Sequence, residues 1–272
     1  MSDALNALVD LLALEPLEEN LFRGRSQDLG LPQLFGGRCS AKPSRPPPIP
    51  WMPNAACTPC TATSCVPAMP DAGGLSVDAV RDGASFTTRR ITAIQKGRPI
   101  FFCSASFHGE ETSITHQPRM PEVAPPDAPE NDDTRVTRFP GHPIEFRHLE
   151  DSAEPGQPAR KRLWFRLAGE LPDDPALHRY LLAYSSDFNL LTTSLVPHDI
   201  TFGDPRLQIA SLDHALWFHH DVKVNDWLLY DMDSPWAGGA RGFSRGSIYD
   251  RDGRLVASSA QEGLTRLRDT PR

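Results

Sequence analysis

Apolar side chains recur with a helical period in the second half of the chain. Five of them are spaced three or four residues apart, as on one buried helix face: Leu177, Leu181, Tyr184, Phe188 and Leu191. Asp174 and Pro175 predict where this helix starts, because aspartate caps a helix N-terminus and proline suits its first turn. The spacing predicts a helix of about five turns with Asp187 in its middle.

Runs rich in β-branched and aromatic residues surround this helix and predict strands. These runs occupy residues 161–168, 207–218, 227–232, 241–250 and 254–261. At the other end of the chain, Leu5, Leu8 and Leu12 predict a short amphipathic helix. One long helix combined with consecutive antiparallel strands predicts the α+β class.

Two similar segments, 83–107 and 239–263, predict an internal duplication. An offset of 156 residues without gaps aligns three pairs: Gly83 with Gly239, Arg89 with Arg245, and Gly97 with Gly253. Each copy is typical of a hairpin, with a strand, a tight glycine turn and a second strand. Residues 110–140 are rich in Pro, Asp and Glu and are expected to form an exposed linker. The predicted halves are therefore 1–109 and 141–272.

Residues 38–72 differ in composition from the rest of the chain. They hold nine of the 27 prolines and four of the five cysteines, and they show neither a helical nor a strand period. The spacing Cys57-x2-Cys60-x4-Cys65 is of the kind that binds metals or forms disulfides. A fourth ligand is missing, because Cys39 is far off and no histidine lies in the range. We therefore expect no metal site.

Charge and hydropathy exclude several classes of protein. The net charge of −7 and the pI of about 5.7 argue against binding to nucleic acid or to an anionic membrane. No window approaches about 18 consecutive apolar residues, so no transmembrane helix is expected. The N-terminus carries Asp3 and Asp10 without a basic start, unlike a secretory signal. We expect a cytoplasmic protein.

Three segments together resemble a known family of hydrolases. They are LLALEPLEENLFRGRSQDLGLPQLFGG at 11–37, DAVRDGASFTTRRITAIQKGRPIFFCSASF at 78–107, and nearly all of 160–263. These segments are similar to the type II acyl-CoA thioesterases, the TesB-like enzymes. The resemblance implies a tandem (double) hot-dog fold, in which each half is an antiparallel sheet wrapped around a central helix. It also implies hydrolysis of fatty acyl-CoA without a cofactor, and homo-oligomers that associate through their sheets.

The resemblance also implies three catalytic residues. Thioester hydrolysis needs a nucleophilic water, a base that takes its proton, and donors for the oxyanion. Matched by motif, these roles go to Asp187 in YSSDFNLL, Ser211 in IASLDH and Gln261 in SAQEG, which together would hold the water. The family more often has threonine at the position of Ser211. Serine keeps the hydroxyl but lacks the methyl group that restricts its rotamer.

Neighbouring polar residues allow other assignments. Adjacent strand residues point to opposite faces, so Asp213 and His214 are not expected to act as a dyad, and His214 is expected to be a structural hydrogen-bonding residue. Arg241 and Arg245 either meet CoA phosphates or are exposed strand arginines. An enoyl-CoA hydratase of this fold would carry a histidine five residues after the aspartate, and Thr192 at that position argues against hydration.

The unusual composition of residues 38–72 has two interpretations, a frame error in the gene or a genuine insert. Read in a shifted frame with G/C-rich codons, the same bases give a proline-free helix pattern followed by LHALHGYF. That string is similar to LDHALWF at 212–218, as the duplication requires. We infer that one base was lost near the codon for Arg38 and that the frame returns near Gly73.

A frame error would damage the first half, because it would remove a central helix and a strand. The alternative function is therefore a non-catalytic or unstable member of the same family. The free energy contributed by burying a core helix is large compared with a typical net free energy of unfolding of about 5–15 kcal/mol. We therefore expect the sequence as written to fold poorly.

Overall fold

The computed structural model describes residues 3–24, 56–64, 73–128, 136–138, 142–149 and 151–269. Within these ranges the helices are α1 (Asp3–Leu12), α3 (Pro175–Ser185) and the 3-10 helix η2 (Leu191–His198). No helix in these ranges is long and apolar enough to cross a membrane.

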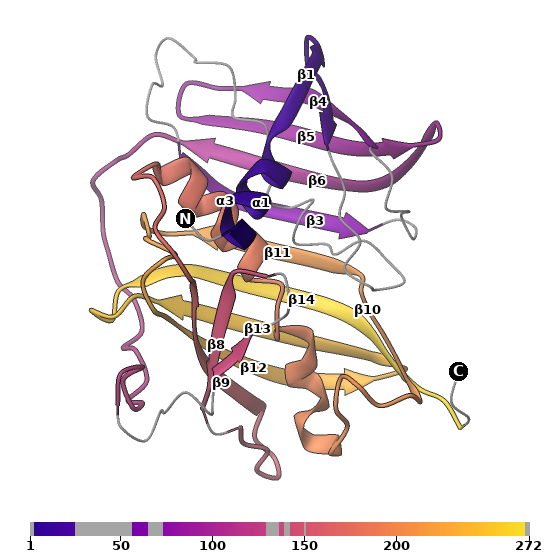
Figure 1. The fold of residues 1–272 in the computed structure, drawn as a ribbon, viewed down its shortest axis with the longest axis vertical. Helices are drawn as coiled ribbons and strands as arrows, with labels where there is room; N and C mark the ends of the chain where they lie inside the picture. The colour runs from indigo at the N-terminus through magenta and orange to yellow at the C-terminus, as the bar shows by residue number, and fades with distance from the viewer. Residues whose placement is uncertain are drawn as a thin grey trace.

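Strands make up most of the described chain (Figure 1). In the first half they are β1 (Leu14–Glu18), β2 (Leu21–Gly24), β3 (Ala56–Ser64), β4 (Gly73–Asp82), β5 (Phe86–Gln95) and β6 (Arg98–His108). Next come β7 (Val136–Arg138), β8 (Ile144–His148), β9 (Ala159–Leu167) and β10 (Leu207–Ser211). The last are β11 (Asp213–Phe218), β12 (Leu228–Gly238), β13 (Arg241–Tyr249) and β14 (Leu255–Leu267).

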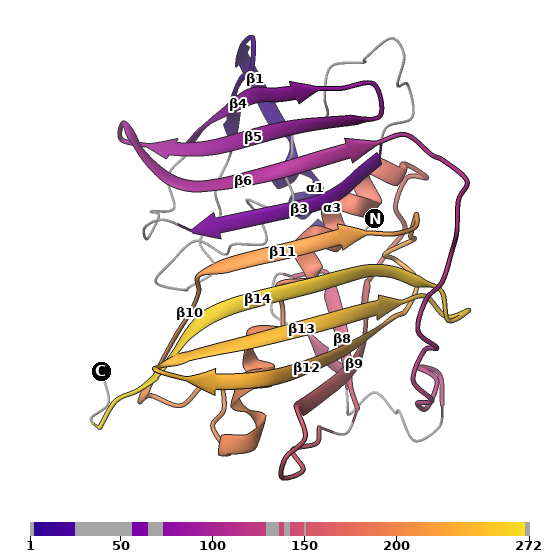
Figure 2. The same ribbon diagram turned by 180° about the vertical axis from the view of Figure 1, so that it is seen from behind.

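The described strands form one continuous sheet whose order is symmetrical about its middle (Figure 2). In the middle, β3 pairs antiparallel with β11, and moving outward β6, β5 and β4 on one side match β14, β13 and β12 on the other. The offset of 156 residues carries β11 onto residues 57–62, which lie inside β3. The strand order confirms the predicted duplication.

The two hairpins differ in one detail from the gap-free alignment. The β5–β6 turn is Lys96-Gly97, with φ of 51° and 73°, as a tight two-residue hairpin turn requires. The β13–β14 connection is longer. The buried side chains of β5 are at odd-numbered positions, whereas those of β13 are mainly at even-numbered positions. Arg89 is therefore buried whereas Arg245 is exposed. The predicted match of these two arginines is wrong, because a one-residue shift reverses the face of every side chain.

Strand β3 lies within the proline-rich range for which no strand pattern was seen. That expectation is wrong for residues 56–64, because pairing with β6 and β11 gives this backbone hydrogen-bonding partners on both sides. The β3–β6 register shifts between Cys57 and Cys60, so Pro59 sits at a bulge, where a missing N–H is tolerated. Residues 38–55 and 65–72 lie outside the described residues. Cys39 and Cys65 are among them, and so is the segment where the frame error was expected to remove a helix.

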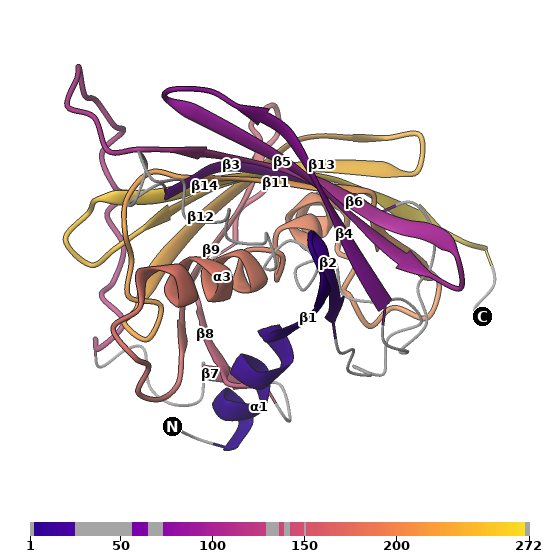
Figure 3. The ribbon, with the colours of Figure 1, turned by 90° about the horizontal axis from the view of Figure 1, so that it is seen from above.

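Helix α3 packs against the concave face of the sheet, which arches over it in Figure 3. The side chain of Asp174 accepts a hydrogen bond from the Ala176 N–H at 2.9 Å, and Pro175 opens the helix, as predicted. Leu181 and Tyr184 are buried in the second-half core. Leu5 and Leu8 of α1 join the same core, which confirms the N-terminal amphipathic helix.

Helix α3 ends earlier than the sequence predicted. It stops at Ser185, so the prediction of five turns is wrong and Asp187 lies just beyond the helix. The hydroxyls of Ser185 and Ser186 donate to the carbonyls of Leu181 and Ala183, which competes with regular helical bonding. Asn189 then takes a left-handed conformation with φ of 67°, which turns the chain into η2.

The segment after β6 crosses to the second half and is anchored there. Gln117 donates to the Gly253 carbonyl at 2.8 Å and accepts from the Leu255 N–H at 3.1 Å. Further along, the Trp164 indole donates to the Ala124 carbonyl at 2.9 Å. These contacts hold residues 117–124 against the convex face of the second half.

Candidate active site

Three elements converge on one buried polar cluster beside the end of α3. Asp187 follows that helix, Ser211 ends β10, and Gln261 lies in β14. Ser211 pairs with Gly263, two residues from Gln261, so both side chains can reach the same side of β14. A Cβ at Gly263 would lie 2.9 Å from the Ala210 carbonyl, so glycine permits this close approach of the strands.

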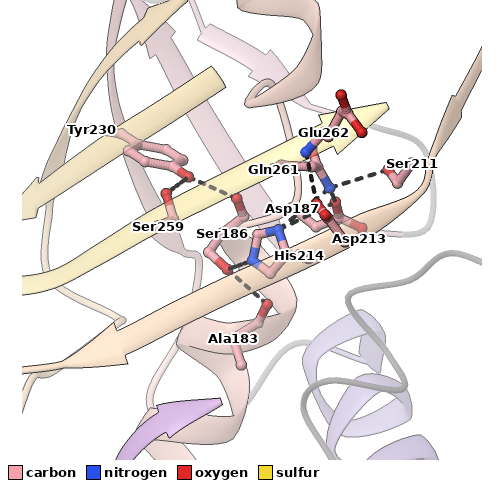
Figure 4. Close-up of polar contacts among 10 residues, drawn as sticks. All are labelled: Ala183, Ser186, Asp187, Ser211, Asp213, His214, Tyr230, Ser259, Gln261 and Glu262. Atoms are coloured by element: carbon pink, nitrogen blue, oxygen red, sulfur yellow. Dashed lines mark hydrogen bonds and ion pairs between the residues drawn. The ribbon is translucent and has the colours of Figure 1, made fainter. Parts of the chain in front are cut away.

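The predicted catalytic side chains are in direct contact (Figure 4). The Nε2 of Gln261 donates to Asp187 Oδ1 at 2.6 Å and to Ser211 Oγ at 3.1 Å. Gln261 and Asp187 are 1% and 8% exposed, whereas Ser211 is half-buried. The structure thus brings together all three residues named from the sequence, and Ser211 lies on the more open side.

The carboxylate of Asp187 determines which way the Gln261 amide points. An ionised carboxylate only accepts hydrogen bonds, so the amide NH2 must face it and the amide oxygen must face elsewhere. Gln261 Oε1 is buried and has no hydrogen-bond partner among the described residues. A buried acceptor of this kind favours a bound water or a polar group of a substrate.

His214 also belongs to this cluster. Its Nδ1 lies 3.3 Å from Gln261 Nε2 and 3.8 Å from Asp187 Oδ1. Burial lowers the pKa of His214, against the opposing effects of Asp187 and Asp213. Sequence reasoning left it out of the site. The strand alternation that put Asp213 and His214 on opposite faces is confirmed, and it was the one signal that could have pointed His214 inward.

The cluster continues through Ser186 to the second-half core. Ser186 Oγ lies 2.9 Å from His214 Nε2 and donates to the Ala183 carbonyl at 3.0 Å. Tyr230 OH donates to the Ser186 carbonyl at 2.8 Å and contacts Ser259 Oγ at 2.7 Å. Burial raises the pKa of Tyr230, so its hydroxyl stays protonated and can donate. These bonds hold the residue that precedes Asp187.

Comparison with known proteins identifies the family. The chain is 33% identical to acyl-CoA thioesterase 2 of Haemophilus influenzae, over 98% of this chain and 99% of that protein. The chain belongs to the acyl-CoA thioesterase family. The family model described as acyl-CoA thioesterase matches residues 138–264, the range that contains the polar cluster.

Solved structures support the same assignment. The crystal structure of acyl-CoA thioesterase II TesB2 from Mycobacterium marinum matches at a TM-score of 0.81 and 35% identity, over 96% of this chain and 98% of that one. An Alicyclobacillus acidocaldarius protein described as having a hot-dog fold matches at a TM-score of 0.77 and 21% identity, over 96% of this chain and 98% of that one. The predicted hot-dog fold and α+β class are confirmed.

Two arginines of this thioesterase lie away from the cluster. Arg245 forms an ion pair with Asp233, and Arg241 pairs with Glu262 at 3.0 Å. Both side chains are exposed on β13, on the face opposite the buried Ser244, which pairs with Gln261. They are exposed strand arginines in this structure. Within the described ranges, no three His, Cys, Asp or Glu side chains gather as a metal site.

Proposed function

We propose that the chain hydrolyses fatty acyl-CoA thioesters to free fatty acids and CoA, with Asp187, Ser211 and Gln261 activating the water. One observation carries this proposal: Gln261 Nε2 contacts both Asp187 and Ser211 inside a buried cluster. Family membership supplies the substrate class. Association of the chain into homo-oligomers stays a prediction.

The chemistry begins with a water bound between Asp187 and Ser211. The water oxygen attacks the thioester carbonyl carbon while Asp187 takes one proton, which is general-base catalysis. Ser211 Oγ accepts the second hydrogen of the water, while Gln261 Nε2, which donates to both Asp187 and Ser211, holds these two side chains around it. The carbon–sulfur bond of the tetrahedral intermediate then breaks, and the CoA sulfur leaves and gains the proton. The two products, the free fatty acid and the CoA thiol, together contain every atom of the thioester and the water.

Substitution of the proposed base tests this assignment. Asp187→Asn keeps the shape of the side chain but cannot take a proton, so kcat should fall by on the order of 100-fold or more. The matched control is Asp199→Asn, because Asp199 is exposed and has a left-handed φ of 51°, which asparagine also tolerates. The rate is measured as free thiol released from a series of fatty acyl-CoAs.

Four outcomes decide between the candidate functions and test the role of Asp187. Thiol release by the wild type that is lost only in Asp187→Asn supports the proposal. An equal rate in both variants would remove Asp187 from the mechanism. Loss of the double bond of an enoyl-CoA without thiol release would instead favour hydration, and a folded wild type inactive on every thioester would favour the non-catalytic alternative.

A further inference from the structure

His214 lies between two of the proposed catalytic elements and contacts both. It is 4% exposed, in β11, with Gln261 of β14 on one ring nitrogen and Ser186, the neighbour of Asp187, on the other. A side chain in this place can set the distance between the strand that carries the amide and the turn that carries the carboxylate. We propose that His214 is a positioning residue that aims the Gln261 amide at Asp187. This inference rests on the proposed function.

The hydrogen-bond donors in the cluster assign one tautomer to the ring. The Gln261 NH2 can only donate, so His214 Nδ1 at 3.3 Å must accept. His214 Nε2 must then carry the hydrogen and donate to Ser186 Oγ at 2.9 Å, while the Ser186 hydroxyl donates onward to Ala183. Along the path from Gln261 through His214 to Ser186, each donor faces an acceptor only when the imidazole is neutral.

Burial favours the neutral ring that this arrangement requires. Desolvation lowers the pKa of His214 more than Asp187 and Asp213 raise it. A protonated ring would turn a hydrogen on Nδ1 toward the Gln261 NH2, placing one donor against another. His214 is therefore suited to accept and unsuited to serve as the proton-carrying group of the reaction.

The Gln261 amide shows why such an acceptor matters. Its two hydrogens face three acceptors, namely Asp187 Oδ1 at 2.6 Å, Ser211 Oγ at 3.1 Å and His214 Nδ1 at 3.3 Å. The acceptor on the ring keeps the amide plane turned so that Oε1 faces away from the carboxylate. Without it, the amide can rotate, and small errors in position at a reacting centre cost up to about 100-fold in rate.

Two substitutions separate the two contacts of the ring. His214→Asn places an amide oxygen near the position of Nδ1, so it keeps an acceptor for Gln261 and loses Ser186. His214→Gln reaches the position of Nε2, so it keeps a donor for Ser186 and loses the acceptor. We expect His214→Gln to lower kcat by on the order of 10- to 100-fold with little change in KM. His214→Asn should keep kcat within about threefold of the wild type, since the acceptor remains.

Other patterns of activity would overturn the inference. Equal losses in both variants would show that the ring only packs the core, and no loss in either would show that it positions nothing. A loss confined to His214→Asn would show that Ser186, rather than Gln261, is the contact that counts. Thermal unfolding of each variant shows whether a loss of rate follows from a loss of fold.

A second measurement does not depend on catalysis. In long-range proton–nitrogen spectra of the 15N-histidine-labelled wild type, the signals absent from His214→Gln belong to His214. At neutral pH we expect a neutral ring with hydrogen on Nε2, and a ring with hydrogen on Nδ1 would overturn the inference. If the wild type hydrolyses no acyl-CoA, the proposed function fails, and this spectrum still decides whether His214 accepts from Gln261.

Discussion

At the scale of single residues, the motifs named three side chains that the fold brings into contact. Asp187, Ser211 and Gln261 are far apart in the sequence, yet one amide nitrogen joins them. Their identity was readable because each lies in a recognisable motif. His214 was missed as a member of the site because its role depends on Ser186, just beyond α3, and on Gln261 of β14. Strand alternation could turn His214 inward but could not identify these partners.

Ser211 provides the prediction at this scale. Ser211→Ala removes the hydroxyl that we propose orients the water, so kcat should fall by on the order of 10- to 100-fold. Ser211→Thr keeps the hydroxyl and adds a methyl group that restricts χ1, so kcat should equal or exceed that of the wild type. Thiol-release assays on folded variants measure both. An alanine variant as fast as the wild type would show that this hydroxyl does not act.

At the scale of elements, the early end of α3 has a clear consequence for the site. The helix stops at Ser185, and the Tyr230–Ser186 hydrogen bond holds the turn that carries Asp187. The apolar period predicted a longer helix because Phe188 still packs against the same core and Leu191 is also buried. Periodicity reports which side chains are buried, while the backbone bonds that end a helix depend on local hydroxyls and on packing.

Gly246 gives the prediction at this scale. A Cβ there would overlap the Tyr230 ring and lie 2.8 Å from Ser259 Oγ, so Gly246→Ala should displace the tyrosine. The free energy of unfolding should fall by about 1–3 kcal/mol, and kcat should fall with it. Gly74→Ala in β4 is the matched control, since nothing lies within 4 Å of its Cβ. Urea unfolding measures both, and equal stabilities would contradict this packing.

At the scale of the whole molecule, burial of histidines ties stability to pH. Desolvation lowers the pKa of four histidines: His148, His178, His214 and His219. The unfolded chain therefore takes up protons at a higher pH than the folded one, and acid favours unfolding. Stability should be fully present above the ordinary histidine pKa of about 6.5 and fall as the pH drops through the folded values.

Unfolding by urea at a series of pH values between 7.5 and 5 measures this effect. The midpoint should move to lower urea concentration as the pH falls below about 6.5. Buried His178 accepts a hydrogen bond from the Val224 N–H at 3.3 Å, and His178→Asn keeps an acceptor without a titrating group. That variant should show a weaker dependence on pH, and a midpoint that does not move in the wild type would contradict the prediction.

The proline-rich range gives a second prediction at this scale. We expect the chain as written to be poorly soluble and the chain with residues 38–72 re-read in the shifted frame to unfold in one cooperative thermal transition. Resequencing codons 36 to 76 comes first, since a restored base would remove the proline-rich range altogether. A soluble, cooperatively unfolding chain with the sequence as written would contradict the expectation that it folds poorly, and an unchanged codon sequence would contradict the frame error.

The sequence by itself determined the family, the duplication and the three candidate catalytic residues, because motifs and turn glycines are local features that survive without knowledge of the fold. Only the tertiary structure decided where α3 ends, which face Arg89 and Arg245 occupy, and that His214 joins the site. These depend on strand register and on contacts between distant segments. A shift of one residue reverses a strand's faces, and nothing in the local pattern records such a shift.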